Sequence, residues 1–383
     1  MVRQIKLKYF FVCLSLSLSF WGCTADKLEM VVPSLELKYF LQPPLVEQDD
    51  ILLGLKWYLS YLGAPLNTGD LENAVRLDTE KQQLSINFTA LKFDKQAEYE
   101  LLKIINTILQ SSTYKAQGYI DLGRFVMLSF NSSLHYYKIT QVAKRYTDFL
   151  NRFNFEDTAM LVLNQQTSSV SNGTRVIFRS QLPYSSFSDV AFLAIEGIGD
   201  YSHDSFVPLS FEVFDFMNNG QPRFAIYDTV GLLKTAASPL HSSAGKPAKC
   251  MWCHESGIQA NFVGNGAIFD AFNTQIGSFN DQIAQLRYAL PADLDYQQLQ
   301  AHSLAELLYV TFMEPTEERI AAEWQLGIAE TQAILQQLQP QQNPEFPQMG
   351  WVYNRTQIDS LAPFSPIIVP ENYRDSAHYE PEF

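Results

Sequence analysis

The positions of the four cysteines limit how this chain of 383 residues can fold. Cys13 and Cys23 lie in an N-terminal segment that is typical of a leader, so Cys250 and Cys253 are the cysteines of the remaining chain. A single pair with this close spacing cannot form a disulfide scaffold. The fold must therefore depend on a hydrophobic core, and 46% hydrophobic residues supply enough apolar side chains to build one.

Residues 1–23 have the pattern of a secretory signal. Arg3, Lys6 and Lys8 form a basic start, and the apolar segment 9–20 that follows is too short to span a bilayer. The pattern predicts that the protein is exported.

The end of this leader resembles the lipobox of bacterial lipoproteins. A small residue, Gly22, precedes Cys23, although Phe20 and Trp21 stand where that box usually carries Leu and a small residue. The resemblance implies that Cys23 carries acyl chains such as palmitate and becomes the mature N-terminus. We then expect a lipid-anchored protein of the cell envelope, at the outer membrane, facing the periplasm or the cell surface. The alternatives are an ordinary signal peptide with an incidental Cys23, or a plain transmembrane anchor.

Acidic residues outnumber basic ones by 41 to 27. Without the three basic residues of the leader, the remaining 24 basic and 41 acidic residues give a formal charge of −17. Such a surface repels phosphate backbones and anionic headgroups. We therefore expect no nucleic-acid partner, and a membrane contact that depends on the N-terminal lipid.

The remaining cysteine pair belongs to the motif Cys250-Met251-Trp252-Cys253-His254, which is C-x-x-C-H. This is the attachment signature for haem c: the two thiols add to the vinyl groups of one porphyrin, and the adjacent imidazole becomes the proximal iron ligand. The motif predicts covalent haem on Cys250 and Cys253, with His254 on the iron.

Three other interpretations of the motif stay open. A redox-active dithiol normally follows a buried strand, and residues 242–249 contain no apolar run. A structural zinc site would need a fourth ligand from His203, His241, His302 or a carboxylate. The third is a structural disulfide with an accidental histidine.

Beyond the motif, the chain resembles a mono-haem class I cytochrome c over residues 245–338. Apolar spacing predicts a helix across 276–290, and the capping-box pattern Ser303-Leu304-Ala305-Glu306 predicts a second helix that ends at Met313. A final helix, with Ile320, Trp324, Ile328, Leu335 and Leu338 on its apolar face, is predicted after Pro315.

This resemblance implies that Met313 is the distal iron ligand. Two features depart from the family: no amphipathic helix precedes Cys250, and Met313 lacks a loop rich in Pro and Gly. Met349, His302 or His241 could therefore take the sixth position, or it could be vacant.

The larger N-terminal part contains no recognisable catalytic motif, so catalytic residues stay unassigned. His135, Asp200, His203 and Asp204 lie near predicted loops, either as members of an active site or as solvated loop residues. Helical spacing occurs at 49–62, 98–109 and 136–153, and strand-like segments occur at 84–88, 160–163, 175–178, 190–194, 209–214 and 223–227.

These patterns predict an α+β fold. The expected parts are a signal peptide (1–23), a mixed domain of unknown function ending in an antiparallel sheet (24–238), a mostly helical cytochrome c-like domain (239–340) and an extended proline-rich tail (341–383). Residues 239–248, which contain Ser, Gly and Pro throughout, are the expected hinge between the two domains. The predicted function is electron transfer with a redox partner protein or a small-molecule electron donor or acceptor. Whether the protein is an enzyme is left open. The alternatives are a haem-dependent envelope oxidoreductase with an open iron site, or a binding lipoprotein in which Cys250 and Cys253 form a disulfide.

Overall fold

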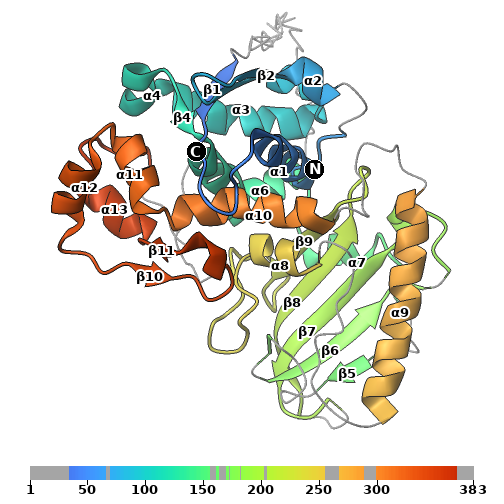
Figure 1. Ribbon diagram of the computed structural model, residues 1–383. Helices are drawn as coiled ribbons and strands as arrows, with labels where there is room; N and C mark the ends of the chain where they lie inside the picture. Colours follow the sequence, from blue (N-terminus) through green and yellow to red (C-terminus); the bar gives the residue numbers. More distant parts are fainter. Residues whose placement is uncertain are drawn as a thin grey trace, which may run out of the picture. The chain divides into compact units, whose positions relative to one another are not determined.

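The computed structural model shows helices and two main sheets, which agrees with the α+β prediction (Figure 1). The structure describes residues 34–65, 70–155, 161–163, 170–171, 173–181, 183–201, 205–254, 267–288 and 299–368. The leader with Cys23 lies outside these residues. Among the residues that are described, no helix combines the length and the apolar character needed to cross a membrane.

The larger sheet has five strands, all antiparallel to their neighbours, in the order β5-β6-β7-β8-β9. A hairpin joins the last two strands, where the Met217 N–H donates to the Gln221 carbonyl (2.9 Å) and Gly220 takes φ +81°. The predicted antiparallel sheet is therefore confirmed. Its strands are β5 (Leu161–Leu163), β6 (Thr174–Arg179), β7 (Ala191–Ile198), β8 (Val207–Phe216) and β9 (Pro222–Tyr227).

Both faces of this sheet are covered, because side chains alternate between the faces along each strand. On one face, Phe192 packs against Phe279 of α9 (Ala267–Tyr288), with ring centroids 5.7 Å apart. On the other face, Phe211 stacks on Tyr146 of α7 (Tyr146–Leu150) at 4.1 Å. Figure 1 shows α9 running along the sheet. The first face also carries α8 (Pro247–His254), which contains the C-x-x-C-H motif.

The N-terminal part is mostly helical and carries a second, smaller sheet in the order β2-β3-β1-β4. Its strands are β1 (Leu35–Lys38), β2 (Val75–Asp78), β3 (Gln83–Ile86) and β4 (Ile120–Asp121), with β1 and β4 parallel. The helices are α1 (Gln48–Tyr61), α2 (Asp70–Ala74), α3 (Lys95–Gln110), α4 (Ser112–Gln117), α5 (Leu122–Val126) with a π-helical turn (Met127–Asn131), and α6 (Ser133–Thr140).

Helix α10 (Leu299–Met313) packs against both α1 and α5. A Cβ at Gly54 of α1 would lie 2.9 Å from the Leu304 carbonyl oxygen, so glycine is what permits this approach. The prediction that Ser303 begins the helix is wrong, because α10 starts at Leu299 and Ser303 lies inside it. The predicted end at Met313 is confirmed.

The C-terminal part differs from the sequence prediction in two places. The single helix expected after Pro315 is divided into α11 (Glu317–Trp324) and α12 (Ile328–Leu335), because Gln325 takes φ +55° and ends α11. In place of an extended chain, residues 341–361 contain β10 (Gln341–Gln342), β11 (Trp351–Val352) and α13 (Arg355–Leu361). Their apolar residues form one cluster: Ile320, Trp324, Leu335, Tyr353 and Ile358.

The described residues from 34 onward belong to one compact unit. The Pro-, Ser- and Gly-containing segment before Cys250, expected as a hinge, therefore does not divide the structure into two bodies. Helices from the C-terminal side of that segment, α8 and α10, pack on β9 and α1 from its N-terminal side.

Candidate functional site

Helix α8 holds all the residues of the motif. It begins with Pro247, whose fixed φ suits a first helical position, and it ends at His254. Positions three apart on a helix lie on the same face, so Cys250 and Cys253 are presented from consecutive turns. Both cysteines are half-buried and are not joined in a disulfide.

One side of α8 faces the five-stranded sheet. The imidazole of His254 lies against Phe214 of β8 and Phe224 of β9, with ring centroids 5.9 Å and 5.7 Å apart. Since the two phenylalanines are a cross-strand pair, they form one continuous aromatic surface under the imidazole. The sheet therefore fixes the position of the ring that follows the second cysteine.

The other side of α8 faces the helical part of the molecule. The indole of Trp252 packs against Tyr61 of α1 and Phe130 of the π-helical turn, at 5.4 Å and 5.2 Å between ring centroids. Met251 is fully buried beside it. The residues between the two cysteines thus anchor the helix, and they leave the cysteines and His254 on other faces.

The thiol of Cys250 is held in its protonated form. Burial raises its pKa well above the ordinary value, and Glu212 and Cys253 raise it further, against weaker opposing effects of Arg175 and Lys249. Redox-active dithiols have the opposite property, a lowered pKa that favours the thiolate. The electrostatics of Cys250 therefore do not favour a dithiol oxidoreductase.

In the described part of the chain, no three His, Cys, Asp or Glu residues are arranged as a metal site. The described residues therefore do not support the zinc interpretation of the motif. His241 lies in a turn, where its N–H donates to the Ser238 carbonyl (3.0 Å). His203 lies outside the described residues, and nothing is described of the His302 side chain within α10.

Met313 lies in different surroundings from His254. It is buried at the C-terminal end of α10, directly after Phe312, which packs against the guanidinium groups of Arg124 and Arg355. Figure 1 shows this end of α10 continuing towards α11, while α8 lies under the other half of the helix. Met349 is also buried. The assignment of Met313 as distal ligand stays a prediction.

Of the four dispersed polar residues considered for an active site, His135 and Asp200 lie in the described part of the chain. His135 is buried, and its Nδ1 lies 2.6 Å from the Ser132 hydroxyl. Burial lowers the pKa of His135 to about 4, and nearby Lys138 and Lys103 lower it as well, so the ring is neutral at pH 7. Asp200 is exposed in the loop after β7, and His203 and Asp204 lie outside the described residues.

Sequence reasoning missed a buried ionic cluster on the sheet face that carries α8. Arg175 of β6 is paired with Glu196 of β7 and with Glu212 of β8. Serine hydroxyls complete the cluster: Ser171 donates to Glu196 (2.5 Å), and Ser242 lies 3.4 Å from Glu212. The available signal was the presence of acidic residues, Glu196 and Glu212, inside mostly apolar strands, since such charges are rarely buried without a partner.

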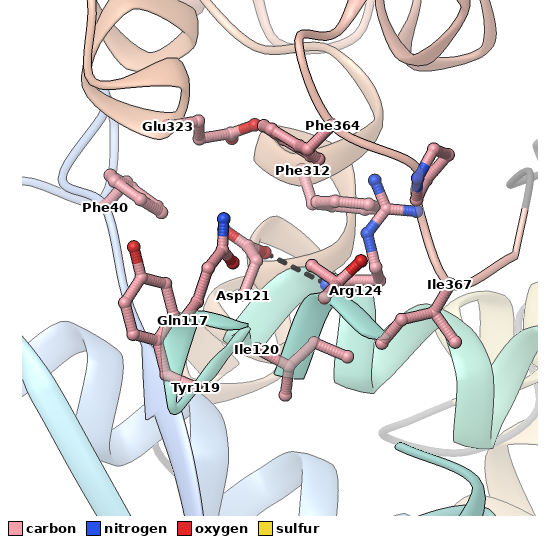
Figure 2. Close-up of a pocket in the computed structure, with 12 residues that line it drawn as sticks. Phe40, Gln117, Tyr119, Ile120, Asp121, Arg124, Phe312, Glu323, Phe364 and Ile367 are labelled. Carbon is pink, nitrogen blue, oxygen red and sulfur yellow. Dashed lines mark hydrogen bonds between the residues drawn. The ribbon is translucent and has the colours of Figure 1, made fainter. Parts of the chain in front are cut away.

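A second buried ionic cluster, also missed, surrounds Phe312. Arg355 pairs with Glu323, Arg319 pairs with Asp121 and Glu323, and Arg124 pairs with Asp359. A pocket of about 40 Å³ opens beside it. Figure 2 shows Phe40 and Tyr119 on one side of this pocket and Arg124 and Ile367 on the other. The cationic and anionic groups satisfy one another, which makes this cluster a structural junction between α5, α10, α11 and α13.

Comparison with known proteins identifies no relative of this chain. No family model, no curated protein and no solved structure matches this chain. A functional assignment must therefore be argued from the residues of the chain itself.

Proposed function

We propose that this protein is an exported c-type cytochrome that transfers single electrons through a haem attached to Cys250 and Cys253, with His254 as the proximal iron ligand. The observation that carries the proposal is the placement of the motif on α8. Two thiol residues lie one turn apart, and the imidazole at the next position is set against the Phe214–Phe224 surface.

The residues present fit a haem. Cysteine thiols supply the atoms of two thioether bonds, and histidine is the usual axial ligand at this position of the motif. Aromatic side chains beside His254 provide the apolar, water-poor surroundings that a porphyrin requires. When bound, the haem would supply a one-electron couple, and the chain would position it, limit its access to water and set its potential.

The cellular setting of the proposal depends on the leader. Covalent haem attachment takes place outside the cytoplasm, and the pattern of residues 1–23 favours export. Acylation of Cys23 would hold the protein at the envelope membrane, where a redox partner protein or a small-molecule donor or acceptor exchanges electrons with it.

The test is the intact mass and the visible spectrum of one sample of the full chain, produced in a host with haem-attachment machinery. We expect a mass increase of one haem and a reduced α band that survive acid-acetone extraction. The double variant Cys250→Ser/Cys253→Ser should lose both. Trp252→Phe is the matched control, because it changes the same helix but leaves C-x-x-C-H intact. A colourless protein, or a mass lowered by the two hydrogens of a disulfide, would contradict the proposal.

The distal ligand is tested separately. Met313 is proposed in this role, and a methionine ligand raises the reduction potential relative to a second histidine. Met313→Ala should change the axial-ligand spectrum, whereas Met349→Ala, at another buried methionine, should not. An unchanged spectrum in Met313→Ala would remove this assignment alone.

One observation favours a second candidate, a haem-dependent oxidoreductase with an open iron position. Met313 is buried at the end of α10 that continues towards α11, whereas α8 with His254 lies under the other half of that helix (Figure 1). Rapid binding of carbon monoxide to the reduced wild-type protein would support this candidate. Absence of binding would favour the electron carrier.

A further inference from the structure

The buried ionic cluster of Arg175, Glu196 and Glu212 lies on the sheet face that carries α8 and its motif. Glu212 precedes Phe214 by two residues on β8, so both side chains project from the same face of the sheet. Arg175 and Glu196 are cross-strand partners on that face. Both Glu212 and Arg175 act electrostatically on the thiol of Cys250. The cluster is therefore coupled to the motif by position and by charge.

The geometry of the cluster places two carboxylates on one guanidinium nitrogen. Nη1 of Arg175 donates to Glu196 and, at 2.9 Å, to Oε2 of Glu212. The Glu196 side chain is 1% exposed, and its second oxygen accepts from Ser171. Two buried like charges this close disfavour simultaneous ionisation. Burial raises the pKa of Glu196, Arg175 lowers it in part, and Glu212 raises it further.

Charged and titratable groups face this cluster from several elements. Strands β6, β7 and β8 supply its three members. Helix α8 contributes Cys250 and Lys249. Within this set, Glu196 is the carboxyl that burial and the second carboxylate favour in its protonated form.

We propose that Glu196 exchanges a proton with solvent in step with the oxidation state of the haem. This inference rests on the proposed function. With haem bound, the gain of one electron from a one-electron donor would be accompanied by the transfer of one proton from solvent to the Glu196 carboxylate. On oxidation, the electron passes to the acceptor and the carboxyl returns its proton. The buried site keeps the same net charge in both states.

The test is the midpoint potential of the haem-loaded full chain, measured by mediated titration across a pH series. Full coupling changes the redox equilibrium constant tenfold for each pH unit, which is 59 mV for one electron. In the wild type we expect the midpoint potential to fall as the pH rises, by up to 59 mV per pH unit. Glu196→Gln mimics the protonated carboxyl, so its potential should equal the wild-type value at low pH and exceed it at high pH.

Two further variants make the comparison specific. Glu80→Gln, at an exposed position, should keep the wild-type slope. Ser171→Ala removes a hydrogen bond that lowers the pKa of Glu196, so the sloping region should move to higher pH. If Glu196→Gln does not fold, Ser171→Ala still tests the role of Glu196, because the Ser171 substitution leaves both ion pairs of Arg175 in place.

A slope in Glu196→Gln equal to that of the wild type would overturn the inference, because the titrating group would then lie elsewhere, for example on the haem propionates. A wild type without any slope would overturn it too. If the protein carries no haem, the proposed function itself fails. In that case a carbon-13 NMR titration of the Glu196 carboxyl still shows whether it holds a proton near neutral pH, so the two failures are distinguishable.

Discussion

Phe312 is the residue around which the C-terminal part is joined to the rest of the molecule. Its ring lies 4.2 Å from the Arg355 guanidinium, 5.0 Å from that of Arg124 and 5.9 Å from that of Arg319. Stacking keeps the guanidinium planes in place, and the in-plane N–H groups remain available for carboxylates. A buried cluster of this kind stabilises the fold only while every charge has its partner.

Glu323 is the acid on which this balance depends most. It accepts from Arg355 (2.6 Å) and Arg319 (2.7 Å). Burial alone would raise the pKa of Glu323, but Arg355 and Arg319 overcome this effect and lower it to about 2. Its unfolded-state pKa is about 4.3. The resulting stabilisation is thus complete above the unfolded-state pKa and is lost as the pH falls towards 2.

We therefore expect Glu323→Gln to lower the free energy of unfolding by about 3–5 kcal/mol at pH 7, because it leaves buried arginines without a full set of acceptors. The difference in the free energy of unfolding between this variant and the wild type should become smaller as the pH falls from 5 to 2.5. Urea unfolding at a series of pH values measures both quantities, with the exposed Glu80→Gln as control. A difference as large at pH 2.5 as at pH 7 would show that the loss of stability does not come from the charge of Glu323.

Single residues were only partly predictable from the sequence. The motif at Cys250, Cys253 and His254 has a fixed spacing that can be read directly from the chain. The two ionic clusters join residues far apart along the chain, such as Arg124 and Asp359. An acidic residue within a mostly apolar strand indicates a buried charge, but one sequence does not show which distant residue is its partner.

The packing of α10 on its neighbours depends on small residues at the points of contact. A Cβ at Gly123 of α5 would lie 2.2 Å from the Phe312 Cβ and 2.9 Å from the Leu308 carbonyl oxygen. These atoms belong to or adjoin the backbone of α10, so they cannot move without shifting the whole helix. The closeness of α5 and α10 therefore requires glycine at this position.

We expect Gly123→Ala to destabilise the protein by about 1–3 kcal/mol or more, since overpacking forces the two helices apart. The matched control is Gly277→Ala on α9, where a Cβ meets nothing within 4 Å. That change should be neutral or stabilising by up to about 1 kcal/mol, because alanine favours a helix over glycine. Thermal unfolding of both variants gives the comparison, and equal losses of stability would contradict this account of the interface.

The elements that the sequence predicted well are those with a strong repeating pattern. Strand alternation located β6 to β9, and helical spacing located α1, α3 and α9. The errors occur where a turn residue overrides the spacing. Gln325 adopts a left-handed conformation that glutamine rarely takes, so nothing in the apolar pattern from 320 to 338 marked the break between α11 and α12.

The whole molecule combines segments that the sequence suggested were separate. Local composition placed a hinge before Cys250, because proline, serine and glycine commonly mark linkers. The structure uses this segment differently: the Ala237 N–H donates to the Gly245 carbonyl (2.9 Å), and Ala237 and Ala244 pack on Ile226 of the sheet. A linker and a packed loop can thus have the same composition, and long-range contacts distinguish them.

The shared core leads to a prediction about cooperativity. The segment 239–340 contains the motif, but Phe214 and Phe224, which hold His254, belong to β8 and β9, and the face that α10 packs on belongs to α1 and α5. We expect the segment alone to lack a cooperative thermal transition by circular dichroism. The chain from residue 24 onward should unfold in one step, with near- and far-ultraviolet signals coinciding. Two resolved steps, or a segment 239–340 that melts cooperatively, would mean that the motif is carried by an independent domain, and the aromatic wall of the sheet would then be dispensable for holding His254.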